Sequence, residues 1–217
     1  KPQPKMPTAA ATLTRGSQAE TGCMGWSPKI KQALCVVGNE RLGTVPDGEQ
    51  QGWRVVSVGG KPPKTFVISS WNPAKDSPPD DARRITPKLR ASVSAYLKKH
   101  RFVTLPESYD MVRGDELAFA SPRVRFRFSQ TKTQVKERAG SWTDYSNTLE
   151  VKCGKQAYAT VHEWESTESG DVAVWRIHGT PYFVLTASYE IGREGEIGAG
   201  SWAELVDGAA CAKDSPE

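Results

Sequence analysis

Alternation of apolar and polar residues predicts that most of this chain is β-strand. The clearest case is residues 124–128, VRFRF, where the period of two is typical of a half-buried strand. Short apolar runs separated by Gly- and Pro-containing turns, the pattern of antiparallel hairpins, recur on both sides of it: 33–37, 53–58, 65–71, 149–151, 157–164, 172–177, 182–189 and 202–206. These segments predict hairpins and meanders as the main architecture.

One stretch changes to a helical period. Thr86 suits an N-cap and Pro87 suits the first helical position. The apolar residues that follow fall on one helical face at i, i+4, i+7 and i+8: Leu89, Val93, Tyr96 and Leu97. The sequence therefore predicts an α+β protein, predominantly antiparallel β, with one central helix around residues 87–100.

Two stretches of the chain share a spacing of landmarks. Trp, Gly, Pro and Phe-Val positions follow Cys35 and Cys153 at distances that agree within about four residues. A weak internal duplication of a β-unit is one interpretation. The other is that unrelated hairpins have aromatic flanks and Gly or Pro turns in common. The choice concerns architecture and not chemistry.

The N-terminal segment differs in composition from the rest of the 217 residues. It is rich in Pro and small polar residues, and Met6 and Leu13 are its only sizeable apolar side chains, too few to offset the entropy of ordering. We predict that residues 1–21 are a disordered tether. Residues 22–217, which contain all seven Trp, are predicted to form a single compact β-rich domain.

The cysteine pattern bears on the compartment. Cys23, Cys35, Cys153 and Cys211 form an even set without the close Cys pairs of zinc sites. Structural disulfides in an oxidising compartment are the favoured interpretation. The alternatives are buried free thiols in a cytosolic protein and a redox or metal site. Of the three connectivities, we favour Cys23–Cys35 and Cys153–Cys211.

No segment has the ~20 apolar residues of a membrane-spanning helix, and no apolar leader begins the chain. The absence of a leader fits a cytosolic protein as well as a mature exported one. The cysteines favour an exported protein, in the periplasm, at the cell surface or outside the cell. The predicted N-terminal tether would also suit attachment to a membrane, as in a lipoprotein.

Charge is distributed unevenly along the chain. Residues 82–138 carry fourteen basic and five acidic groups, whereas residues 139–217 carry five basic and thirteen acidic groups. On the strand 123–128, Arg123, Arg125 and Arg127 project to one face, where a row of guanidiniums suits an anionic polymer. The alternative is a solvated face, or one paired with the acidic C-terminal third. Nucleic acid is disfavoured because the aromatic residues project to the opposite face.

Catalytic and metal-binding patterns are weak. His162-Glu163 begins like HExxH, but position 166 is Ser, and a strand does not give the helical two-His geometry of a zinc site. Glu163 and Glu165 have a separation suited to a glycosidase pair, although alternating acids usually form the wet face of a strand. No metal or cofactor is expected.

Trp142 lies in a segment, 140–145, that looks like a loop, and an exposed Trp there would stack on sugars or on a partner protein. The alternative is that it packs in the core. Together these observations favour an exported or envelope-tethered, non-enzymatic binding module for an anionic polymer or a partner protein. The alternative is an envelope hydrolase acting on glycan or peptide through His162, Glu163 or Glu165.

Overall fold

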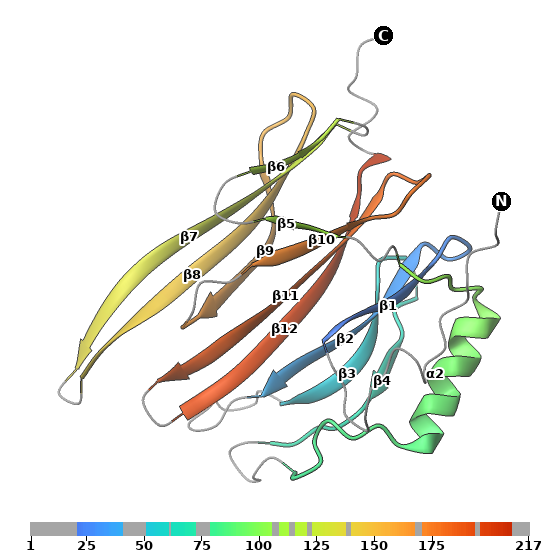
Figure 1. Cartoon of the computed structure of the whole chain (residues 1–217), viewed down its shortest axis with the longest axis horizontal. Coiled ribbons are helices and arrows are strands. Elements are labelled where there is room, and N and C mark those ends of the chain that lie inside the picture. Colours follow the sequence, from blue (N-terminus) through green and yellow to red (C-terminus); the bar gives the residue numbers. More distant parts are fainter. Residues whose placement is uncertain are drawn as a thin grey trace. The chain divides into compact units, whose positions relative to one another are not determined.

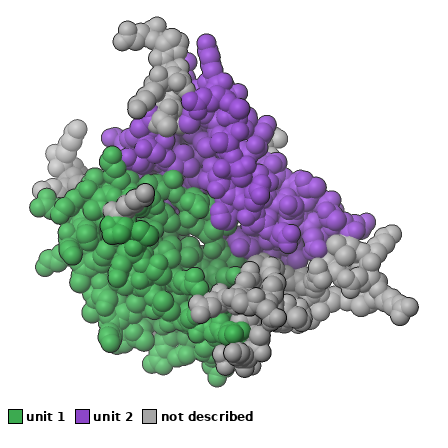
Figure 2. Space-filling view, turned by 180° about the vertical axis from the view of Figure 1, so that it is seen from behind, with its two compact units in different colours: residues 1–105, 198–205 green, residues 106–197, 206–217 purple. Residues whose placement is uncertain are grey.

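A computed structural model describes most of the chain. The described residues are 21–40, 51–60, 62–72, 79–105, 109–112, 116–120, 123–137, 140–167, 171–193 and 196–209. They divide between two compact units, residues 1–105 with 198–205 and residues 106–197 with 206–217 (Figure 2). The tether predicted over residues 1–21 lies outside the described residues except for Thr21. That residues 22–217 form one domain stays a prediction, and each unit is described by itself.

Unit 1 is an antiparallel sheet with one helix (Figure 1). Its strands are β1 (Gly22–Ser27), β2 (Gln32–Glu40), β3 (Gly52–Val58), β4 (Thr65–Val67) and part of β12 (Glu196–Asp207), and its helix is α2 (Pro87–Lys99). Strand β2 pairs with β1, with β3 and with β12, while β4 pairs with β3. The hairpin predicted from the strands 53–58 and 65–71 is confirmed by the pairing of β3 with β4, in which Arg54 lies opposite Val67.

Helix α2 confirms the predicted helix. Its N-cap is Thr86, whose side-chain oxygen accepts a hydrogen bond from the backbone N–H of Leu89 at 3.2 Å. Val93 and Leu97 are fully buried and belong to one apolar cluster with Leu34 and other residues of the sheet. The helix is therefore held by tertiary packing of its apolar stripe.

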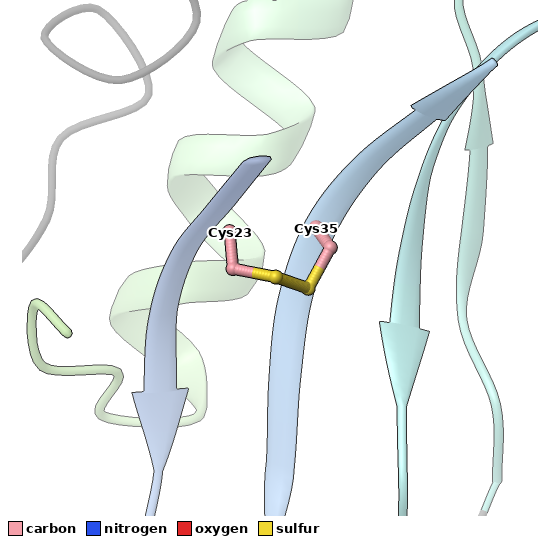
Figure 3. The surroundings of a disulfide bond; sticks show 2 residues. All are labelled: Cys23 and Cys35. Carbon is pink, nitrogen blue, oxygen red and sulfur yellow. A yellow bond between two sulfur atoms is a disulfide. The ribbon is translucent and has the colours of Figure 1, made fainter. Parts of the chain in front are cut away.

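The first predicted disulfide is confirmed. Cys23 of β1 and Cys35 of β2 lie directly opposite each other and are joined through their sulfurs (Figure 3). Cys153 is also disulfide-bonded. Its predicted partner, Cys211, lies outside the described residues.

Unit 2 contains two sets of antiparallel strands. One consists of β6 (Glu116–Phe119), β7 (Val124–Glu137), β8 (Gly140–Cys153) and β9 (Ala159–Ser166), and the other of β5 (Asp110–Val112), β10 (Val172–Arg176) and β11 (Tyr182–Arg193). Their inner faces meet through aromatic rings. The ring centres of Phe119 and Phe126 lie 4.9 Å and 5.4 Å from that of Phe183 on β11. The unit is thus a two-layered β-structure with an aromatic core.

Strands β7 and β8 extend beyond their predicted lengths. The alternation over 124–128 is confirmed, because Val124, Phe126 and Phe128 are buried while the intervening arginines are exposed. However, the ladder continues to Glu137 opposite Gly140. The prediction of a loop over 140–145 is therefore wrong: these residues begin β8, because cross-strand backbone hydrogen bonds stabilise a ribbon that has no regular apolar alternation.

The pairing registers of two hairpins allow a comparison of the two segments of the proposed duplication. Both segments form antiparallel hairpins, β3–β4 and β10–β11. In the β3–β4 hairpin, Phe66 lies opposite Val55, two residues after Trp53. In the β10–β11 hairpin, Phe183 lies opposite Arg176, one residue after Trp175. The duplication stays a prediction, since the hairpins agree in type but differ in register.

A buried amide links three strands of unit 2. Asn147 of β8 is fully buried, and its Oδ1 accepts a hydrogen bond from Gln130 Nε2 of β7 at 2.8 Å. Its Nδ2 donates to Ser166 Oγ at 2.9 Å and to the Trp164 carbonyl at 3.2 Å, both on β9. Because a shift of one residue would turn this side chain to solvent, the amide specifies the register of all three strands.

Replacing Asn147 with Ala should lower the free energy of unfolding by about 1–3 kcal/mol, because the partner groups on β7 and β9 would be left buried without a hydrogen bond. Urea denaturation measures this difference. Ser146→Ala, at the adjacent and exposed position, is the matched control and should change the value by less than about 0.5 kcal/mol. Equal effects of the two substitutions would contradict the role of Asn147.

His100, at the C-terminal end of α2, makes the stability of unit 1 depend on pH. Its carbonyl accepts a hydrogen bond from Ser27 Oγ at 2.5 Å, and its ring lies 4.5 Å from that of Tyr96. Burial, and then the charges of Lys99 and Lys29, lower the pKa of His100 below its usual value of 6.5. The unfolded chain therefore binds the proton more readily than the folded protein.

The free energy of unfolding should fall as the pH drops through about 6.5 and should level off below the lowered pKa of His100. Urea denaturation between pH 7.5 and pH 5 tests this, and His100→Gln should flatten the profile. His178→Gln, in an exposed turn, is the control, and the profile of His100→Gln should be flatter than that of this variant. An unchanged profile in His100→Gln would refute the assignment.

Candidate functional site

The outer face of the sheet β6–β9 carries the predicted arginine row. Because side chains alternate along β7, Arg123, Arg125 and Arg127 are all exposed on this face. The side chain of Arg125 is 56% exposed and that of Arg127 is 45% exposed. The three arginines differ in what they contact, and this difference determines which of them is available to a ligand.

Arg127 is held on two sides. Its Nη2 and Nε lie 2.7 Å and 2.8 Å from Oε2 of Glu150, its cross-strand neighbour on β8. Its guanidinium carbon also lies 3.9 Å from the ring centre of Tyr158, a cation–π contact. The charge of Arg127 is therefore largely balanced within the protein. This agrees with the alternative interpretation, in which the arginine face pairs with acidic residues of the C-terminal third.

Arg125 forms a second ion pair. Its Nη1 lies 3.1 Å from Oε1 of Glu116 on β6, and the other oxygen of that carboxylate accepts a hydrogen bond from the hydroxyl of Tyr158. This hydrogen bond, and then the positive charge of Arg125, lower the pKa of Glu116; the same hydrogen bond raises the pKa of Tyr158. Glu116 thus stays ionised and holds Arg125 in one orientation.

Arg123 differs from both, since it forms no ion pair with any residue that the structure describes. Its carbonyl accepts a hydrogen bond from the backbone N–H of Gly154 at 3.0 Å, which ties the start of β7 to the turn after β8. That turn also carries Lys155, which is exposed and likewise has no acidic partner in the described part of the chain.

These cations surround a concave surface of unit 2. The hollow has a volume of about 470 Å³, and its described lining residues are Ala118, Phe119, Ala120, Arg123, Arg125, Gly154 and Lys155. We call it the basic hollow. Arg125 is paired with Glu116, but the charges of Arg123 and Lys155 have no acidic partner in the described part of the chain, so the field inside the hollow favours an anion.

The other predicted site residues lie elsewhere. Glu163 and Glu165 are exposed on β9, opposite Thr148 and Ser146, and His162 contacts the ring of Trp164 with 6.1 Å between ring centres. None of them is among the residues that line the basic hollow. The described residues contain no group of three or more His, Cys, Asp or Glu that could hold a metal ion.

Trp142 belongs to β8, where it lies opposite Val135. Its side chain lies outside the described part of the structure, so its predicted role in stacking on a ligand stays a prediction.

Sequence reasoning missed several residues of this face, namely Glu116, Ala118, Gly154, Lys155 and Tyr158. They come from β6 and from the turn after β8, and they reach the arginines only through strand pairing. For Glu116, an alternation of period two over 116–119 would have been the available signal. Lys155 could not have been identified in this way, because a single Lys after a Gly does not indicate a binding site.

Comparison with known proteins adds no identification: no protein-family model matches the chain, and searches of curated proteins and of solved structures gave no significant match. Among the described residues, no helix has the length and apolar character needed to cross a membrane.

The different contacts of the arginines give a stability prediction. Arg127→Gln removes the ion pair with Glu150 and the contact with Tyr158, and it should lower the free energy of unfolding by up to about 1 kcal/mol. Arg123→Gln, two residues away on the same face, is the matched control and should change it by less than about 0.5 kcal/mol. Urea denaturation measures the free energy of unfolding of both variants. A larger decrease in Arg123→Gln than in Arg127→Gln would contradict the contacts described.

Proposed function

We propose that this protein is an exported, non-enzymatic binding module that holds an anionic group of its ligand in the basic hollow. The observation that carries the proposal is the convergence of Arg123, Arg125 and Lys155 on one hollow. Two of these cations, Arg123 and Lys155, have no acidic partner among the described residues, so they are available to a ligand.

The chemistry of the hollow suits phosphate, sulfate or carboxylate. Guanidinium groups bind such anions through two parallel hydrogen bonds, and the ammonium of Lys155 adds a compact charge. Because Glu116 holds Arg125 in place, less side-chain entropy is lost when an anion binds. A volume of about 470 Å³ lies within the usual range of small-molecule sites.

The anionic group that we propose is compact. The row of three arginines suggested a long anionic polymer, but Arg127 is balanced by Glu150. The remaining cations, Arg123, Arg125 and Lys155, all line one hollow. Such a cluster suits one anionic group, which either a polymer or a small molecule can supply.

Export is supported by the disulfide between Cys23 and Cys35, since structural disulfides persist mainly in oxidising compartments. Binding is favoured over hydrolysis because the described lining of the hollow supplies cations without a carboxylate or imidazole to act as general acid or base. Glu163 and Glu165, the pair proposed for a hydrolase, are on another strand and do not line it.

The test removes the two available charges. In Arg123→Gln/Lys155→Gln, affinity for pyrophosphate, measured by isothermal titration calorimetry, should fall at least tenfold, because two charge-assisted contacts are lost. Retention on a heparin column, which measures binding of a sulfated polymer, should shift to lower salt if the natural source of the anion is a polymer.

The control is Arg127→Gln/Lys132→Gln, which removes the same net charge from β7 outside the hollow. Pyrophosphate affinity should then change by no more than about twofold. Equal losses in the two double variants would mean that only the overall charge attracts the anion and would refute the hollow as its site. No measurable binding of pyrophosphate or heparin by the unaltered protein would refute the proposed function.

A further inference from the structure

We infer that the ligand is an amphiphilic anion, a small molecule whose anionic head lies between the cations of the basic hollow and whose short apolar chain or ring lies against Ala118, Phe119 and Ala120. This inference rests on the proposed function and specifies its ligand class.

The hollow is larger than an anionic group requires. The hollow holds about 470 Å³, whereas a water molecule takes a share of only about 30 Å³ of liquid. A phosphate or carboxylate group has five or three heavy atoms and displaces only a few waters. Most of the hollow therefore remains for the part of the ligand to which the anionic group is attached.

Part of the wall of the hollow is apolar. Three successive residues without a polar side-chain atom, Ala118, Phe119 and Ala120, line the hollow together with the cations. Ala118 lies directly opposite Arg125 in the β6–β7 pair. The small methyl group of Ala118 leaves room beside the guanidinium of Arg125, so an apolar surface and a charge adjoin each other.

The apolar part of the wall is anchored in the core of unit 2. The ring of Phe119 is only partly buried, yet its centre lies 6.1 Å from that of Phe126 and 4.9 Å from that of Phe183 in the core of unit 2. These contacts anchor Phe119 and the neighbouring Ala118 and Ala120, so the apolar wall exists before a ligand binds. A preformed wall reduces the ordering cost of binding.

These features favour an amphiphile over a fully hydrated anion. Inorganic phosphate or a sulfated polymer gains only from the cations. A ligand with an apolar part also removes surface of Phe119 and the two alanines from water, at about 25 cal/mol per Å². The wall therefore discriminates between anions that carry the same head.

The test compares three phosphate monoesters with one head, namely methyl, n-butyl and phenyl phosphate, by isothermal titration calorimetry. The three additional methylenes of the butyl ester, about half buried, should tighten binding roughly tenfold relative to the methyl ester. The phenyl ester should gain by a similar factor, and both should show a more negative heat-capacity change.

A variant locates the gain. Ala118→Leu fills the space beside Arg125 and should reduce the advantage of butyl over methyl phosphate to about twofold or less. Ala159→Leu, at an exposed position on β9 outside the hollow, is the matched control and should preserve the advantage. Thermal unfolding of each variant checks that its fold is intact.

The outcomes separate the inference from the proposed function. If all three esters bind equally and lose affinity in Arg123→Gln/Lys155→Gln, the amphiphile is refuted and anion binding stands. If the butyl advantage persists in Ala118→Leu, the chain lies elsewhere and the inference is also refuted. If no ester binds, or binding is unaffected by Arg123→Gln/Lys155→Gln, the proposed function fails and the inference fails with it.

Discussion

The antiparallel ladder between β7 and β8 is the constraint on which unit 2 depends. It pairs residues from Val124 opposite Cys153 to Glu137 opposite Gly140, and a slip of one residue would turn the buried Phe126 out of the aromatic core. Asn147 reinforces that register through both neighbouring strands. Once the register is set, the position of every charged side chain on the outer face follows.

The ladder brings opposite charges together as well as like ones. Arg127 lies opposite Glu150 because of the β7–β8 register, and Arg125 reaches Glu116 because β6 pairs with the other edge of β7. An exposed ion pair contributes little to stability, but it changes which charges are available to a ligand. The face thus has a neutralised part around Tyr158 and an unneutralised part at Arg123.

The basic hollow lies at that unneutralised part. Its charge comes from β7 and from the turn after β8, and its apolar wall comes from β6 and the residue that follows it. Phe119 lines the hollow, and its ring packs against Phe183 in the core. A binding surface built partly from core residues keeps its shape, because movement of the ring would disturb the packing of Phe183.

The sequence alone determined the strands with strong alternation, the helix with its Thr86 cap, the Cys23–Cys35 pair and the outward direction of Arg123, Arg125 and Arg127, because these follow from local periodicity and short-range geometry. It did not determine the length of β8 at 140–145, where ladder bonding outweighs local pattern. Only tertiary structure decided that Arg127 is paired while Arg123 adjoins a hollow with Lys155, because those contacts depend on strand pairing between residues distant in the chain.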